Sequence, residues 1–284
     1  MDWTSRISGK KYAIPLGERT FVMGIINTSP DSFSGDGLNS VDDAVRQAER
    51  FIREGADILD VGGQSTRPGA EAIDAGEEIS RTAPLIKELS SKFDVPVSID
   101  TYKSEVARAA LENGAAMIND ISAFHFDEKM AGLASVYGVP VILMHIKGIP
   151  ETMQKGEIVY DDVIGSIKKY LNRAVKSALE AGIREDMIIL DPGIGFGKTV
   201  EHNLIILKRL AELKELGKPL LVGVSRKSFI GKTLNLPENE RIEGTAAAVS
   251  AAIMNGADII RVHDVAEMKR VAVMTDAIVR AGGA

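Results

Sequence analysis

The chain has 284 residues, of which 45% are hydrophobic and 26% charged, so it can bury a large core, and we predict a single domain over residues 1–284. Its formal net charge of −6 argues against a nucleic-acid surface, which usually needs a concentrated basic face. The absence of cysteine excludes disulfides, thiolate metal sites and a cysteine nucleophile.

No segment of the sequence has the length and apolar character of a membrane span. The most apolar late stretch, residues 246–254, is followed by Asn255 and Gly256. The first residues, Met1, Asp2 and Trp3, do not form a basic region that leads into an apolar run, as a secretory signal would. We therefore expect no membrane contact and a cytoplasmic location.

Short aliphatic runs recur along the chain, and each is followed by a longer stretch in which apolar residues have helical spacing. The runs are almost continuously hydrophobic, which is typical of parallel strands covered on both faces. In chain order we predict strands at residues 21–27, 56–62, 96–101, 117–121, 140–145, 187–193, 219–225 and 259–264. Eight alternations of strand and helix predict a closed (β/α)₈ TIM barrel, with an open doubly wound sheet as the alternative.

The connections between these elements are of two kinds. Six joints that lead into a strand contain a glycine, namely Gly55, Gly114, Gly138, Gly182, Gly217 and Gly256. At the other end of the strands, two connections are long and rich in glycine, proline and serine, residues 28–39 and 63–74. In a barrel both would lie at the mouth where the strands end, the usual position of an active site.

Polar side chains stand at the carboxyl ends of most predicted strands. Each of them alone could cap a helix or begin a turn, but their convergence on one end of a barrel favours a site. His125 and His202 lie away from these ends, and we expect structural roles for both. The strand-end residues are Asn27, Asp100, Asn119, Asp120, His145, Asp191, Ser225, Arg261 and His263.

Two carboxylates and an amide of this set could face a flat heterocycle. The carboxylates of Asp100 and Asp191 could each accept two parallel hydrogen bonds from an edge with amino and ring N–H groups, beside the amide of Asn119. Buried acids repel one another unless a cation is near, and Lys227 is our candidate for that cation. The alternative is that Lys227 is a solvated loop lysine.

The last two units offer groups that suit an anion. Arg261 and His263 leave their strand on the same side, as a site for a leaving phosphate would require. Alternatively, Arg261 pairs with Asp258 or Asp264 as surface charge and His263 is a core histidine. Ser228 begins a predicted helix whose free N–H groups could bind a carboxylate or phosphate.

Three glycines follow the sixth predicted strand. Gly193, Gly195 and Gly197 lack the spacing of a dinucleotide fingerprint or a P-loop, so they are a weak signal for a nucleotide site. We interpret them as a tight strand exit that lets Phe196 lie against a ligand.

Five segments form an ordered set of motifs from the first strand to the last. They are Asn27-Thr28-Ser29-Pro30-Asp31-Ser32-Phe33-Ser34, Gly62-Gly63-Gln64-Ser65-Thr66-Arg67-Pro68-Gly69, Asp191-Pro192-Gly193-Ile194-Gly195-Phe196-Gly197-Lys198, Ser225-Arg226-Lys227-Ser228 and Arg261-Val262-His263-Asp264. In this order they resemble the dihydropteroate synthase family of pterin-binding enzymes. The resemblance covers nearly the whole chain.

The resemblance implies a transferase that joins 6-hydroxymethyl-7,8-dihydropterin pyrophosphate to 4-aminobenzoate, with Mg²⁺, and releases pyrophosphate. The pterin ring would be bound by Asp100, Asn119, Asp191 and Lys227, with Met144, Phe196 and Gly223 around it. The pyrophosphate would be bound by Asn27, Thr66, Arg67, Arg261 and His263, and Asn27 would also contact Mg²⁺. The carboxylate of 4-aminobenzoate would be bound by Ser228, with Phe33, Pro68 and Phe196 enclosing its ring. The residues implied to act in catalysis are Asp31, Arg67, Asp100, Lys227, Arg261 and His263, of which Asp31 and Arg67 lie on the two long loops that close over the site in this family.

The sequence departs from the usual family pattern in two places. Gln64 stands where the family commonly has glutamate, and residues 146–149 replace the usual methionine-arginine-glycine-threonine stretch. The family usually forms homodimers through late helices, and the alanine-rich face at residues 245–252 would permit close helix packing. We therefore predict a homodimer.

For the reaction we hypothesise that pyrophosphate leaves before the amine attacks, because an arylamine has a free lone pair and needs no general base. The protein would then act mainly through electrostatics. Three rivals stay open: a folate-dependent methyltransferase of the same superfamily that acts with a corrinoid partner, a class I aldolase-like barrel with Lys227 as Schiff base, and a non-catalytic pterin-binding module.

Overall fold

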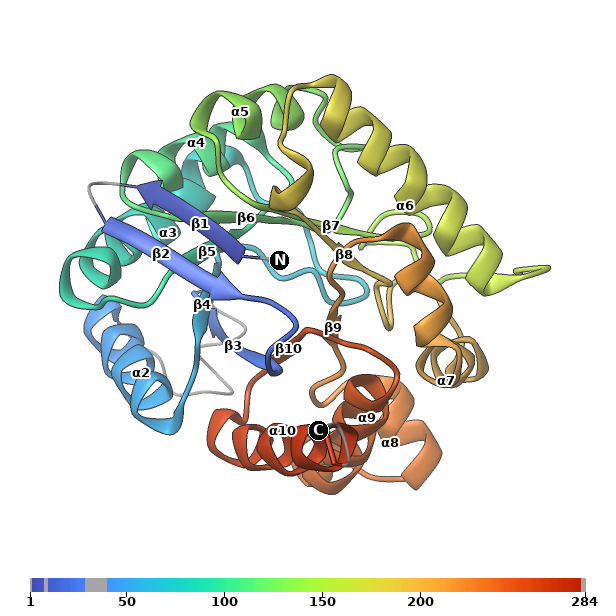
Figure 1. Cartoon of the computed structure of the whole chain (residues 1–284). Helices are drawn as coiled ribbons and strands as arrows, with labels where there is room; N and C mark the ends of the chain where they lie inside the picture. The colour runs from blue at the N-terminus through green and yellow to red at the C-terminus, as the bar shows by residue number, and fades with distance from the viewer. Residues whose placement is uncertain (1, 8–9, 29–39, 282–284) are drawn as a thin grey trace.

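Eight parallel strands form one closed barrel in the computed structural model, which describes residues 2–7, 10–28 and 40–281 (Figure 1). The strands are β3 (Phe21–Asn27), β4 (Ile58–Gly62), β5 (Val97–Asp100), β6 (Met117–Asp120), β7 (Val141–Met144), β8 (Ile188–Asp191), β9 (Leu221–Gly223) and β10 (Ile259–Val262). They pair in the order β8-β7-β6-β5-β4-β3-β10-β9. A parallel bridge between Leu190 and Leu220 joins the two ends of this order. The predicted TIM barrel is thus confirmed, and the open sheet is excluded.

Helices surround the barrel on its outer side (Figure 1). The α-helices are α2 (Val41–Glu54), α3 (Ala75–Lys92), α4 (Ser104–Glu112), α5 (Lys129–Tyr137), α6 (Val163–Glu180), α7 (Val200–Lys208), α8 (Ser228–Leu234), α9 (Ile242–Met254) and α10 (Val265–Val279). Short 3₁₀ helices are η1 (Glu185–Met187), η2 (Leu210–Leu216) and η3 (Glu238–Glu240). Among the described residues, no helix combines the length and apolarity that crossing a bilayer would require.

The strands form where they were predicted because their side chains are buried on both faces. In β3, every residue from Phe21 to Ile26 is buried, and all of β4 is buried. Gly24 lets β3 approach α2 closely, since a Cβ at this position would lie 2.8 Å from the Phe51 ring. The ladder ends one or two residues earlier than predicted in several strands, so Ser225 and His263 lie just beyond β9 and β10.

The six joint glycines also behave as expected. All of them have positive φ, between 61° and 103°. At the end of α2, for example, Gly55 has φ 99° and its N–H donates to Ile52 O at 3.0 Å, which ends the helix and turns the chain into β4.

A hairpin that precedes the barrel was not predicted. Strands β1 (Asp2–Ile7) and β2 (Lys10–Pro15) pair antiparallel, and the following residues lead into the start of β3. The hairpin also contacts η1, which precedes β8 on another part of the wall, so it extends across the end where the strands begin (Figure 1). The opposite end, where the strands finish, carries the polar residues.

Candidate active site

A cavity of about 380 Å³ opens at the carboxyl ends of the strands. Ten of the predicted site residues line it: Asn27, Thr66, Arg67, Pro68, Asp100, Phe196, Lys227, Ser228, Arg261 and His263. The register of the parallel strands explains part of this set. Asn27 of β3 is the partner of Gly62 of β4, and Gly62 is the partner of Asp100 of β5. Asp100 is in turn the partner of Asn119 of β6, so these residues lie at the same height in the barrel wall. The barrel therefore gathers residues that are far apart in the sequence.

The floor of the cavity is an ion cluster inside the barrel. The Arg261 guanidinium donates from Nε to Asp60 Oδ2 and from Nη2 to Asp100 Oδ2, both at 2.6 Å. Asn119 Nδ2 donates to the same Asp60 oxygen at 3.0 Å. The alternative pairing of Arg261 with Asp258 or Asp264 is wrong, since those carboxylates bind Lys214 and Arg226.

Asp60 was not among the predicted site residues, although the sequence contains a signal for it. A fully buried acid stands in the middle of the aliphatic run Ile58-Leu59-Asp60-Val61. A charge in such a place needs a partner, because an isolated buried carboxylate is costly. The partner is Arg261, which also pairs with Asp100. Lys227, which we predicted as the cation beside Asp100 and Asp191, interacts electrostatically with both acids, most strongly with Asp191.

In the described part of the chain, the acid cluster has two oxygens without a partner, and one of them belongs to Asp100, which lines the cavity. Asp60 Oδ1 and Asp100 Oδ1 are buried and have no hydrogen-bond partner among the residues that the structure describes. Burial raises the pKa of Asp100 to about 7, the Arg261 charge opposes this shift, and the nearby Asp60 charge adds to it. The floor can therefore accept N–H groups and stabilise positive charge on a bound ring.

A second acid lies at the end of β8 beside a lysine. Asp191 Oδ1 accepts from Gly193 N at 2.7 Å, and burial raises the pKa of this carboxyl. Lys227 Nζ donates to Ile194 O and lies 4.7 Å from the centre of the Phe196 ring. Burial lowers the pKa of Lys227 to about 8, while the Asp191 charge opposes this shift.

The turn that carries Phe196 is supported from below by Lys198, for which we predicted no role. The buried Lys198 Nζ donates to Gly193 O at 2.8 Å and to Phe196 O at 3.0 Å, and lies 2.9 Å from His145 Nδ1. Burial and the Lys198 charge lower the pKa of His145 to about 2, so the imidazole is neutral and can accept. A Cβ at Gly193 would lie 1.9 Å from His145 O, which explains why this tight exit needs glycine.

Hydrogen-bond donors form the rim on the side of β9 and β10. His263 Nδ1 lies 3.1 Å from Ser225 Oγ, and burial together with the Arg261 charge lowers the pKa of His263 to about 3. Without a ligand, His263 is therefore a neutral imidazole. On the loop after β4, Arg67 pairs at 2.9 Å with Glu238, another lining residue that was not predicted.

The remaining predicted residues lie elsewhere. Asn119, Met144, Asp191 and Gly223 are buried beneath the lining, and Asp31 and Phe33 lie outside the described residues. His125 and His202 have the structural contacts that we expected. His125 Nδ1 contacts Ser122 O at 2.8 Å, and His202 completes the capping box at the start of α7.

Comparison with known proteins places the chain in a family. A model of the family described as "Pterin binding enzyme" matches residues 23–263. A dihydropteroate synthase of Synechocystis is 51% identical over 266 residues, which cover 93% of this chain and 92% of the relative. Among solved structures, dihydropteroate synthase of Clostridium difficile in the presence of pteroic acid has 45% identity and a TM-score of 0.87, covering 93% of this chain and 98% of that one. The Xanthomonas albilineans enzyme with 4-aminobenzoic acid has 38% identity and a TM-score of 0.88, covering 98% of each chain. The chain therefore belongs to the dihydropteroate synthases of the pterin-binding enzyme family.

Proposed function

We propose that the chain condenses 6-hydroxymethyl-7,8-dihydropterin pyrophosphate with 4-aminobenzoate to form 7,8-dihydropteroate and pyrophosphate in folate biosynthesis. The observation that carries this proposal is the pair of unpartnered buried oxygens on Asp60 and Asp100 beneath a rim of donors. An N–H-rich ring would fit the floor, and a diphosphate would fit the rim. The pteroic acid present with the Clostridium difficile protein is consistent with such an occupant.

The geometry favours departure of the diphosphate before attack by the amine. As the bond between the pterin methylene carbon and oxygen breaks, its electron pair leaves with pyrophosphate and positive charge spreads into the ring. The carboxylates of Asp60, Asp100 and Asp191 would stabilise that charge from the floor. The lone pair of 4-aminobenzoate then forms the new C–N bond, and the amine releases a proton to the solvent.

The rim would bind the leaving diphosphate through hydrogen bonds from Arg67, Thr66 and His263. Arg261 lies between this rim and the acids, so it can attract the diphosphate while it keeps the floor charges paired. Ser228, at the start of α8, would bind the carboxylate of 4-aminobenzoate, with Pro68 and Phe196 beside its ring.

We also propose Mg²⁺ as the cofactor, with Asn27 as its protein ligand. Within the described ranges, no group of three or more histidine, aspartate or glutamate side chains could hold a metal alone. Mg²⁺ commonly binds to one or two protein oxygens together with substrate phosphates and water. The amide oxygen of Asn27, at the cavity wall, is a suitable protein ligand of this kind. When bound, the ion would neutralise charge on the diphosphate oxygens.

One assay tests the reaction against its rivals. The protein is mixed with dihydropterin pyrophosphate, 4-aminobenzoate and MgCl₂, and pyrophosphate and dihydropteroate are measured with and without EDTA. We expect equal amounts of both products, and their loss on chelation. Pterin binding without pyrophosphate release would instead identify a non-catalytic pterin-binding module. Borohydride trapping at Lys227 would identify a Schiff-base barrel, and methyl transfer to an added corrinoid protein would identify a methyltransferase.

Replacing Ser228 by alanine is expected to raise the KM for 4-aminobenzoate about 10-fold, because one hydrogen bond to a charged carboxylate is lost. The KM for the pterin substrate should stay unchanged. Asp100→Asn should show the opposite pattern, with weaker pterin binding and slower turnover. Equal effects of Ser228→Ala on both substrates would contradict this assignment.

We further propose that the chain forms a homodimer through α9 and α10, which pack side by side (Figure 1). A groove between them is lined by apolar residues that include Ala246, Met274 and Ile278, and Met274 is 62% exposed. Met274→Glu should raise the dimer dissociation constant at least about 100-fold, because the interface would then bury an unpaired charge. Sedimentation velocity checks this, with Val136→Glu as the matched control, because Val136 on α5 is also exposed. A Met274→Glu dimer of undiminished affinity would reject this interface.

A further inference from the structure

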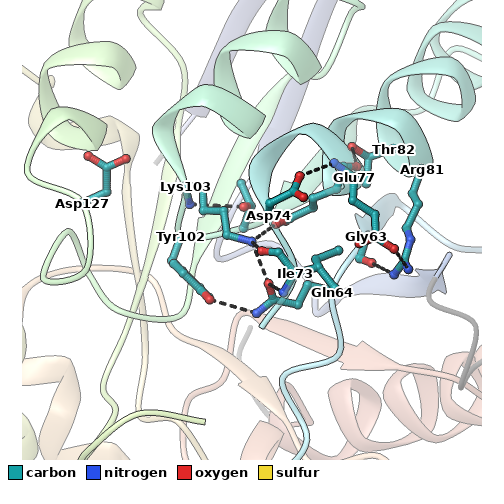
Figure 2. Close-up of polar contacts among 12 residues, drawn as sticks. Gly63, Gln64, Ile73, Asp74, Glu77, Arg81, Thr82, Tyr102, Lys103 and Asp127 are labelled. Atoms are coloured by element: carbon teal, nitrogen blue, oxygen red, sulfur yellow. Dashed lines mark hydrogen bonds and ion pairs between the residues drawn. The ribbon is translucent and has the colours of Figure 1, made fainter. Parts of the chain in front are cut away.

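The loop from β4 to α3, residues 63–74, is fastened at both ends by one lysine that does not line the cavity. Lys103 Nζ donates to Gln64 Oε1 and to Ile73 O, both at 2.7 Å (Figure 2). Gln64 Oε1 also accepts from Ile73 N at 3.1 Å. The start and the end of the loop therefore meet at a single ammonium group, as in a compact Ω-loop.

A buried carboxylate completes this contact set. Lys103 Nζ donates to Glu78 Oε2 at 2.6 Å, and the Glu78 side chain is only 2% exposed. The three donors of the ammonium thus have three acceptors. Gln64 Nε2 donates to the Tyr102 hydroxyl at 2.9 Å.

Helix α3 supports the same end of the loop. Arg81 Nη1 donates to Gly63 O at 3.0 Å. A Cβ at Gly63 would lie 2.7 Å from Thr82 Cγ2 and 2.9 Å from Glu78 Cγ, so the chain can pass this close to the helix only as glycine. The loop start is therefore fixed against α3 as well as against Lys103.

The middle of the loop has fewer contacts with the rest of the protein, and among them Gly69 N donates to Pro150 O at 3.2 Å. Thr66, Arg67 and Pro68 line the cavity. The ion pair between Arg67 and Glu238 is solvent-exposed, and exposed pairs contribute little. The placement of these lining residues therefore depends on the two fastened ends together with the backbone bond of Gly69.

The sequence position of Lys103 links this loop to the cavity floor. Asp100 is the last residue of β5, and Lys103 follows it by three residues, directly before α4. One short segment thus carries a floor carboxylate at the strand end and, three residues later, the lysine that fastens the rim loop. This segment connects the acid floor to the loop that carries Thr66 and Arg67.

We propose that Lys103, acting through Gln64 and Ile73, is a positioning residue for the transfer reaction. It holds Thr66 and Arg67 over the bond that breaks and does not contact the substrate itself. The inference rests on the proposed function, because it assigns the loop to the diphosphate. It also gives a role to Gln64: the amide accepts from Lys103 and donates to Tyr102, whereas a carboxylate could only accept and would add a second negative charge beside Glu78.

The test compares Lys103→Met with Lys92→Met, which removes an exposed lysine of α3. Two quantities are measured: kcat/KM for the diphosphate substrate, and Kd for 6-hydroxymethylpterin, which has the ring but no diphosphate. We expect Lys103→Met to lower kcat/KM about 100-fold, as a displacement of about 1 Å can do. The Kd for 6-hydroxymethylpterin should remain that of the unsubstituted protein, and Lys92→Met should change neither quantity.

A second variant keeps the inference testable if Lys103→Met does not fold. Gln64→Met has similar size, leaves the ion pair between Lys103 and Glu78 in place, and should show the same separation of the two quantities. In the double variant the losses should not multiply, because both substitutions release the same loop. The inference is overturned by unchanged kinetics, by an equal loss of ring binding, or by multiplying effects. An unsubstituted protein that releases no pyrophosphate would overturn the proposed function instead.

Discussion

Arg261→Met is expected to lower the free energy of unfolding by about 3–5 kcal/mol at pH 8, since it removes the cation from a buried ion cluster. Asp60 and Asp100 would lose their 2.6 Å contacts with the guanidinium and would repel each other inside the barrel. Catalysis should suffer as well, with kcat/KM at least about 100-fold lower, because an electrostatic group beside the diphosphate is lost. Urea denaturation and steady-state kinetics measure the two effects.

The stability loss should depend on pH in a defined direction. Burial already raises the pKa of Asp100 to about 7 with Arg261 present, and removal of that positive charge raises it further. An acid with a raised pKa in the folded state has its full stability below its unfolded pKa of about 4, and this stability is lost as the pH rises through the folded value. The difference between Arg261→Met and the unsubstituted protein should therefore be small near pH 4 and largest above pH 7.

Two further variants isolate the cause of this loss. Arg53→Met removes an exposed arginine of α2 and should leave the free energy of unfolding unchanged. Asp60→Asn combined with Arg261→Met removes one of the unpaired charges and should recover part of the lost stability. If the loss in Arg261→Met did not vary with pH, unpaired carboxylates would not be its cause.

The barrel could be predicted because its signals are local and repeated. Each strand is a short run that must be buried on both faces, and each joint glycine ends a helix by taking positive φ. The hairpin of β1 and β2 has no such repetition and lies outside the eight units. Its position also depends on contacts with η1, which exist only once the barrel has formed.

The end of the barrel at which the site residues lie could also be predicted, but the ion pairs between them could not. Strand ends place Asn27, Asp100 and Asn119 at one end of the barrel, and a sequence reveals those ends. Which cation meets which acid depends on closure of the barrel. Arg261 on β10 reaches Asp60 on β4 across 201 positions, with β3 between the two strands. A local sequence pattern carries no information about a pair of residues so far apart in the chain.

The same reason explains the missed lysines. Lys198 and Lys103 have no apolar periodicity of their own, and in the sequence each resembles a solvated loop residue. Folding buries Lys198 under the Phe196 turn and places Lys103 between two loop ends. Their importance comes from the number of backbone and side-chain acceptors around each ammonium, which only the three-dimensional structure reveals.

Lys227→Met should remove the alkaline limb of the activity profile. In the unsubstituted protein, kcat/KM for the pterin substrate should rise through about pH 7 as Asp100 ionises and fall above about pH 8 as Lys227 loses its proton. The ammonium is the form that faces Asp191, lies over the Phe196 ring and can donate to a pterin oxygen. In Lys227→Met we expect kcat/KM to be about 100-fold lower at pH 7.5.

The shape of the profile distinguishes this role from general damage. Methionine does not titrate, so the fall above pH 8 should disappear while the rise near pH 7 remains. Lys227→Arg should also lack the fall, because a guanidinium keeps its proton throughout this range. Lys232→Met, which replaces an exposed lysine of α8 four residues after the lining residue Ser228, should retain both limbs. An alkaline limb that persists in Lys227→Met would assign that titration to another group and leave Lys227 as a packing residue over Phe196.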